Sequence, residues 1–246
     1  MDIAAFENKI VHADCMDILR SLPDKCVDLV LTDPPYGSGG DAQTDGRFGN
    51  KVSRFEKYRD PELTGGTWAS KYERKISDWD VAPTEEVFRE LFRVSKNQII
   101  WGGNYFNLPP TRCFNIWRKL TISEDFTMAM CEYAWTSFAA NAKLWEFAPQ
   151  DKSRFHPTQK PVGLIMRQIE EYTEQDAIIL DPFSGSGTTA IAAHRLGRRF
   201  VCIEKDSEYH AASVKRLDDE RRQGRLDLFP PVTKGNQSHL WTTNGN

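Results

Sequence analysis

The chain has 246 residues, of which 39% are hydrophobic and 27% charged, a composition that suits one globular domain with elaborations. Its formal net charge of −3 excludes a surface that is basic throughout, although a local basic patch is compatible with it. No apolar run reaches the length of a membrane span, and Asp2 and Glu7 stand where a signal peptide would be basic, so we expect a soluble, cytoplasmic protein. The five cysteines are odd in number and form no Cys-x-x-Cys pair, which argues against disulfides and a zinc site.

The N-terminal segment predicts a short strand at residues 9–14 and a helix at residues 15–22, which Asp14 can cap. In α/β sheets, such strand-to-helix junctions line the ligand crevice. Spacing alone favours a helix cap over a ligand contact for Asp14.

The next strand, at residues 27–31, leads into Asp33-Pro34-Pro35-Tyr36. The two prolines fix the backbone, so the Asp33 carboxylate and the Pro34 carbonyl are held as preorganised acceptors. Together they can accept both hydrogens of an exocyclic amine on a nucleobase and leave its lone pair free to attack. Tyr36 offers a flat surface on which a base can stack, a contact of roughly 1–3 kcal/mol. The alternative is an Asx-type turn that closes the strand, with Tyr36 packing beside it.

A long polar insert at about residues 38–75 carries a mixture of basic and aromatic residues. From residue 47 to residue 75 there are eight basic and four acidic residues, with five aromatic residues interleaved. This mixture suits phosphate neutralisation and base stacking, so it predicts a DNA contact. A solvated loop anchored by its aromatic residues is an equally weighted alternative. The basic residues that we expect to contact DNA are Arg47, Lys51, Arg54, Lys57 and Arg59.

The central segment predicts a helix that begins after Thr84, followed by strands at residues 98–101, 113–117, 128–136 and 144–147. The tryptophans of this region are expected in the core rather than as stacking platforms. The segment 156–161 then introduces an amphipathic helix at residues 162–172, with Pro161 placed for its first turn.

The last third of the chain predicts a βαβ unit with strands at residues 177–181 and 200–204 and a helix that ends at Leu196. The turn of this unit contains Gly185 and Gly187, and Glu204 ends its second strand. Glycines, free helix amides and a terminal carboxylate are the features that bind an adenosine-containing cofactor, either NAD or S-adenosylmethionine. Hydride transfer gives the Asp-Pro-Pro-Tyr turn no role, whereas methyl transfer to an amine uses both sites. A helix at about residues 206–225 and a polar tail at residues 228–246 follow.

The order of these motifs resembles that of the β-class amino DNA methyltransferases, whose catalytic motif precedes the cofactor motif, a circularly permuted order. The likeness extends over about residues 9–217. It implies a Rossmann-like α/β fold with a seven-stranded, mostly parallel sheet and one reversed strand, forming a single methyltransferase domain at residues 1–227. It also implies S-adenosylmethionine as methyl donor, a flipped target base and no metal.

The resemblance assigns roles to individual residues. Asp33, Pro34, Pro35 and Tyr36 form the catalytic motif, and a second set of residues binds the cofactor, with Asp14 near the adenine, Asp181 near the methionine and Glu204 on the ribose. The full cofactor set is Asp14, Thr158, Lys160, Asp181, Phe183, Ser184, Gly185, Gly187, Thr188 and Glu204.

Asp in the first motif position is typical of adenine-N6 enzymes, whereas cytosine-N4 enzymes more often have Ser, so we expect a site-specific adenine-N6 DNA methyltransferase of the restriction-modification or orphan type. The alternatives are a cytosine-N4 enzyme and a catalytically inactive nucleic-acid-binding subunit. Residues 137–155 are too few for a separate recognition domain. We therefore expect recognition to rest on the insert, on a second subunit of a homodimer, or on both, and weak sequence preference is a further alternative.

Overall fold

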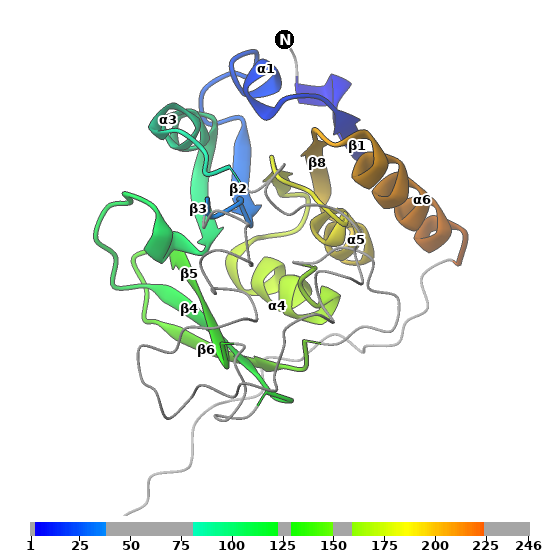
Figure 1. Cartoon of the computed structure of the whole chain (residues 1–246). Helices are drawn as coiled ribbons and strands as arrows, with labels where there is room; N and C mark the ends of the chain where they lie inside the picture. Colours follow the sequence, from blue (N-terminus) through cyan, green and yellow to red (C-terminus); the bar gives the residue numbers. More distant parts are fainter. Residues whose placement is uncertain (1–2, 38–80, 123–128, 150–158, 224–246) are drawn as a thin grey trace, which may run out of the picture.

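The computed structural model describes residues 3–37, 81–122, 129–149 and 159–223, and all eight of the strands found there belong to one sheet (Figure 1). The strand order is β1-β8-β7-β2-β3-β5-β4-β6. The strands are β1 (Lys9–His12), β2 (Val27–Thr32), β3 (Ser95–Trp101), β4 (Phe114–Lys119), β5 (Cys131–Thr136), β6 (Lys143–Phe147), β7 (Ile178–Asp181) and β8 (Arg199–Glu204). The helices are α1 (Cys15–Leu19), α3 (Glu85–Val94), α4 (Val162–Tyr172), α5 (Thr188–Arg195) and α6 (Ser207–Gln223), with short 3₁₀ turns η1 (Ile3–Ala5) and η4 (Gly103–Tyr105).

The sheet is mostly parallel, with β5 as its one reversed strand within the described residues, because β5 pairs antiparallel with both β3 and β4. This confirms the predicted α/β architecture. The predicted number of seven strands was wrong, because β6 pairs in parallel with β4 and adds an eighth strand at the edge. The sequence pattern had placed a strand at residues 144–147, and the family resemblance had not.

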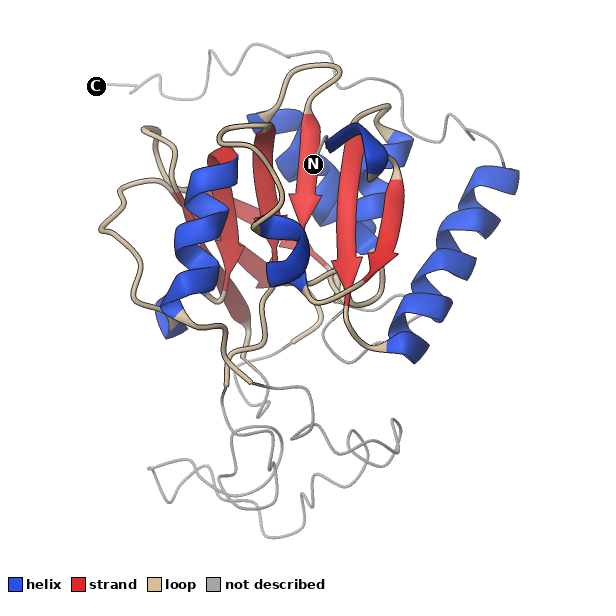
Figure 2. Cartoon of the chain, turned by 90° about the horizontal axis from the view of Figure 1, so that it is seen from above, coloured by secondary structure: helices blue, strands red, loops and turns tan. Residues whose placement is uncertain are grey.

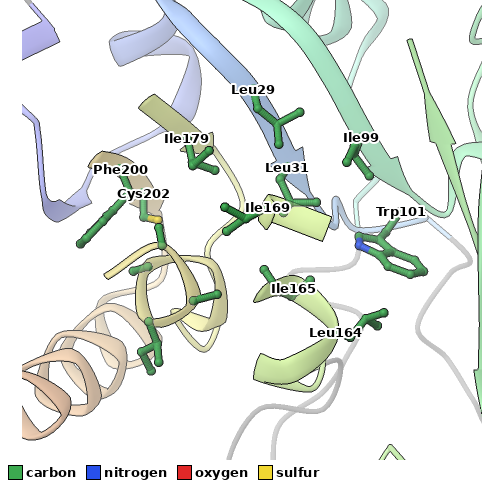
Figure 3. Packing of buried hydrophobic residues seen from close by; sticks show 14 of the residues in the cluster. Leu29, Leu31, Ile99, Trp101, Leu164, Ile165, Ile169, Ile179, Phe200 and Cys202 are labelled. Atoms are coloured by element: carbon green, nitrogen blue, oxygen red, sulfur yellow. The ribbon is translucent and has the colours of Figure 1, made fainter. Parts of the chain in front are cut away.

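Helices cover both faces of the sheet, which is therefore the middle of three layers (Figure 2). On one face α4 and α5 pack against the strands, with Ile169 of α4 beside Leu31 and Leu164 on the side of Trp101 (Figure 3). On the other face, Leu19 of α1 and the apolar side of α3 form the second part of the core. Strands buried on both faces read as continuous apolar runs, which explains why the parallel strands were visible in the sequence. The apolar side of α3 comprises Val87, Phe88, Leu91 and Val94.

The element boundaries follow the sequence closely, with a few shifts. The first helix ends at Leu19 rather than Leu22, and β3 begins at Ser95, three residues earlier than predicted, since it pairs with β2 from Val27 onwards. Thr84 is the N-cap of α3, but its side chain makes no capping hydrogen bond. The basic insert at residues 38–75 and the tail at residues 228–246 lie outside the described residues.

The topology brings two distant parts of the chain to the same edge of the sheet. β2 from the N-terminal part lies between β7 from the C-terminal part and β3. In a parallel sheet the carboxyl ends of such strands meet at one edge, where ligands of α/β proteins bind. In the described part of the chain, no helix is both long and apolar enough to cross a membrane.

Candidate active site

The carboxylate of Asp33 is the centre of the candidate site, one residue beyond the end of β2. Its Oδ1 accepts a hydrogen bond from the Tyr36 hydroxyl at 2.7 Å, and its Oδ2 accepts one from Lys160 Nζ at 2.5 Å. Its side chain is only 17% exposed, and burial raises the pKa of Asp33 while the Lys160 ammonium opposes that effect. Both oxygens act as acceptors, which is the arrangement of an ionised carboxylate.

The Tyr36 ring is held on several sides. Its hydroxyl is bonded to Asp33, and its ring stacks on Tyr105 with 4.7 Å between centroids and an interplanar angle of 18°. Gly102, at the end of β3, has φ +66°, and a Cβ there would lie 2.1 Å from Cε1 of Tyr36. Burial and the neighbouring Asp33 raise the pKa of Tyr36 well above its ordinary value, so the hydroxyl remains a donor.

Asp33 begins a row of four charges that alternate in sign, in which the two lysines are buried and the two carboxylates half-buried. Lys160 Nζ also lies 3.0 Å from Oε2 of Glu132 on β5, and Oε1 of Glu132 lies 2.7 Å from Nζ of Lys119 on β4. Burial disfavours the charged form of Lys160, but the two carboxylates outweigh it and raise the lysine pKa. Burial likewise opposes ionisation of Glu132, yet Lys160 and Lys119 lower its pKa to about 2. The row of charges is therefore Asp33, Lys160, Glu132 and Lys119.

Asp181 connects the end of β2 to the glycine turn. It ends β7, next to β2, and its Oδ1 accepts hydrogen bonds from Thr32 Oγ1 at 2.8 Å and from the Phe183 amide at 3.2 Å. The side chain is buried, and burial raises the pKa of Asp181 to about 6. Asp33 and Asp181 are thus held at the ends of neighbouring strands.

The glycine turn between β7 and α5 depends on two glycines with positive φ, Gly185 (+50°) and Gly187 (+74°). Gly187 is the N-cap of α5. Glu204, at the end of β8, lies against this turn, since its Oε2 accepts from the Gly185 amide at 2.7 Å and its Oε1 from the Asp206 amide at 2.8 Å. Each of these oxygens has a second lone pair, so the carboxylate can also accept from a ligand hydroxyl.

Asp14 lies near Glu204, because His12 of β1 is the register partner of Glu204 on β8. One Asp14 oxygen accepts from the Met16 amide at 2.9 Å, which is the predicted helix cap, and the other pairs with Lys205 at 2.9 Å. Two acidic side chains and a glycine turn at adjoining strand ends form a donor and acceptor set that fits an adenosine moiety.

The other predicted site residues are placed as follows. Pro34, Ser184 and Thr188 are buried, and Pro35 and Phe183 are half-buried. Lys160 directs its ammonium to Asp33 and Glu132, while its carbonyl accepts a 3.4 Å bond from Thr188 Oγ1. Thr158 lies outside the described residues.

Sequence reasoning missed two residues of the site, Glu132 and Lys119. Glu132 stands between Cys131 and Tyr133 in its strand, and Lys119 ends its strand two residues after Trp117 and before Leu120. A charge in such a pattern is a signal for a buried ion pair, but its partner is defined only by the pairing of β4 with β5.

Comparison with known proteins relates the chain to DNA methylases. A family model described as DNA methylase, of the N6 and N4 type, matches residues 111–215. YubD, a candidate methylase of Escherichia coli (strain K12), is 28% identical over 85% of this chain and 90% of its own length. The type II methyltransferase M2.LlaDCHI of Lactococcus lactis subsp. cremoris is 28% identical over 86% of this chain and 90% of its own length.

Two solved structures share the fold. The PvuII DNA methyltransferase, named as cytosine-N4-specific, superimposes with a TM-score of 0.53 at 16% identity, over 87% of this chain and 91% of its own. M1.HpyAVI, in a complex with SAM, does so with a TM-score of 0.50 at 21% identity, over 85% of this chain and 98% of its own.

The fold is that of the Rossmann-like methyltransferases. Within that class, the chain is similar to the amino DNA methyltransferases, and its motif order resembles that of the β class.

Proposed function

We propose that this protein transfers a methyl group from S-adenosylmethionine to the N6 amine of adenine in DNA. The observation that carries the proposal is the link between its two sites. The hydroxyl of Thr32, which precedes Asp33, donates to Asp181, which precedes the glycine turn. An amine bound at Asp33 and a cofactor bound at that turn would therefore lie at neighbouring strand ends of one sheet edge.

S-adenosylmethionine, when bound, supplies a methyl group on a positively charged sulfur. The residues proposed to hold it are those of the glycine turn, with Glu204 at the ribose and Asp14 near the adenine. Met16 and Lys205 hold Asp14 in place, and backbone amides hold Glu204, so the acceptors are preorganised. Thr158, Lys160, Asp181, Phe183, Ser184 and Thr188 complete the proposed cofactor set.

The role of Asp33 is to accept one hydrogen of the target amine while the Pro34 carbonyl accepts the other. The amine lone pair forms the new carbon–nitrogen bond as the carbon–sulfur bond breaks, and that bonding pair remains on sulfur. The nitrogen then loses one proton, for which the adjacent Asp33 carboxylate is an acceptor. Most of the rate comes from orientation and from these placed acceptors.

The target base is proposed to stack on Tyr36. Because the ring of Tyr105 stacks on Tyr36, a base that uses that face takes the place of Tyr105. Tyr105 is 56% exposed, so it can leave the ring without opening the core. Contacts with the DNA backbone are proposed for the insert residues named above, and a homodimer is a second proposed source of recognition.

Adenine is the proposed base because the motif begins with Asp33. Cytosine N4 is the second candidate, since one of the proteins that share the fold is named as cytosine-N4-specific. The same pair of acceptors serves either exocyclic amine.

The experiment is methyl transfer from labelled S-adenosylmethionine to unmethylated genomic DNA, followed by hydrolysis and separation of the nucleosides. We expect label in N6-methyl-2′-deoxyadenosine. Label in N4-methylcytosine would keep the mechanism and change the base, and absence of label from DNA with cofactor still bound would overturn the proposal. Heat-denatured DNA in a parallel reaction tests whether the enzyme requires a duplex.

A further inference from the structure

We propose that Glu132 is a positioning residue for methyl transfer, which takes over the Lys160 ammonium when Asp33 binds the target amine. The inference deepens the proposed function and rests on it. Glu132 itself touches neither Tyr36 nor the target amine in this scheme, and it acts only through Lys160.

The geometry gives the Lys160 ammonium two anionic partners. Its Nζ lies 2.5 Å from Oδ2 of Asp33 and 3.0 Å from Oε2 of Glu132. In the part of the chain that the structure describes, these are its two ion pairs. A small movement of the Lys160 side chain therefore moves its shorter ion pair from Asp33 to Glu132.

Glu132 is fixed from behind. Its second oxygen pairs with Lys119 at 2.7 Å, and Lys119 is only 7% exposed. Lys160 Nζ lies over the Trp101 ring, 5.1 Å from its centroid. Glu132 thus remains in position when Lys160 moves, which is the condition for a second binding position of the ammonium.

The reaction needs such a position for two reasons. First, both oxygens of Asp33 already accept a hydrogen bond, from Tyr36 and Lys160, so an incoming amine competes with a strong donor. Second, the attacking nitrogen becomes positively charged, and an ammonium bound to the same carboxylate opposes that charge. Transfer to Glu132 removes the ammonium from Asp33 without leaving it buried and unpaired.

A purely structural role makes a different prediction. If Glu132 only neutralised Lys160 and Lys119, its loss would lower stability and leave the reaction rate of the folded enzyme unchanged. The rate of the chemical step and its dependence on Lys160 therefore separate the two roles.

The test is the single-turnover rate of Glu132→Gln at saturating S-adenosylmethionine and DNA. Gln keeps the shape and removes the charge. We expect the rate to fall on the order of 10- to 100-fold, as is typical when a supporting partner of an active group is lost, with cofactor affinity within about twofold of the parent. Glu132→Asp keeps the charge and should recover part of the rate. Glu146→Gln, whose carboxylate pairs with Arg118 on the exposed side of the neighbouring strand, is the matched control and should leave the rate unchanged.

The decisive step is the same substitution in a Lys160→Met background. With no ammonium to hold, Glu132→Gln should change the rate of that variant by less than about twofold. The inference is overturned if Glu132→Gln retains the parental rate, or if its full effect persists without Lys160. Failure of the proposed function looks different, since the parent enzyme itself would then methylate no DNA.

Discussion

The contact between Gly102 and Tyr36 allows a sharp test of how the tyrosine ring is positioned beside Asp33. In Gly102→Ala the new Cβ would lie 2.1 Å from Cε1 of Tyr36, whereas Cβ atoms in proteins do not approach other heavy atoms within 3.0 Å. The ring must therefore move by about 0.9 Å. Because its hydroxyl lies 2.7 Å from Asp33, a shift of that size along the bond exceeds the usual range of such hydrogen bonds.

Two quantities should change in this variant. Alanine at a positive φ costs about 1–2 kcal/mol of unfolding free energy, which a domain of this size tolerates. Misplacement of a reacting group by about 1 Å lowers the rate on the order of 100-fold. We therefore expect a folded enzyme with a strongly reduced single-turnover rate and unchanged affinity for S-adenosylmethionine.

Gly197→Ala is the matched control, because Gly197 has the same φ of +66°. It follows the C-terminal end of α5, whereas the site lies at the N-terminal end of that helix. The control should lose similar stability and keep its rate. Equal rates for Gly102→Ala and the parent enzyme, measured on folded protein, would refute the proposed role of the Tyr36–Asp33 contact.

Three further predictions concern stability, the base site and DNA. The raised pKa of Asp181, about 6 against an ordinary 3.8, means that its contribution to stability is fully present below pH 3.8 and is lost as the pH rises through 6. Asp181→Asn should therefore gain up to about 3 kcal/mol relative to the parent between pH 4 and pH 7 in urea unfolding, and parallel curves would contradict this. Tyr105→Ala should lower the KM for DNA about two- to tenfold by removing a competitor for the Tyr36 ring, and a raised KM would show that Tyr105 itself holds the base. Joint replacement of three insert residues by Ala should reduce the slope of log affinity against log salt by about 2.7, and an unchanged slope would exclude them from the DNA contact. These residues are Arg54, Lys57 and Arg59.

The sequence was sufficient for the order of elements because most parallel strands are buried on both faces. Runs such as residues 27–31 and 177–181 carry too few polar residues to be anything but interior strands or helices, and their short length decides for strands. The glycine turn was equally predictable, because backbone positions with positive φ favour glycine. Gly185 and Gly187 occupy two such positions. Trp101, Trp117 and Trp135 are buried, as predicted, and Trp145 packs against the core.

What the sequence could not supply was the pairing of charges across the sheet. Lys160 was assigned to the cofactor on its motif, and the structure shows its ammonium between Asp33 and Glu132. Residue 132 is 28 positions away from residue 160 and 99 from residue 33, so no local pattern relates them. Only the antiparallel insertion of β5 between β3 and β4 brings Glu132 to this edge.

The most direct measurement on the central claim is the single-turnover methylation rate of Asp33→Ala, together with its dissociation constant for S-adenosylmethionine. If Asp33 accepts the target amine beside an independent cofactor site, the rate will fall by at least about 100-fold, while the dissociation constant stays within about twofold of the parent. A variant that methylates DNA at the parental rate would show that the amine is bound elsewhere.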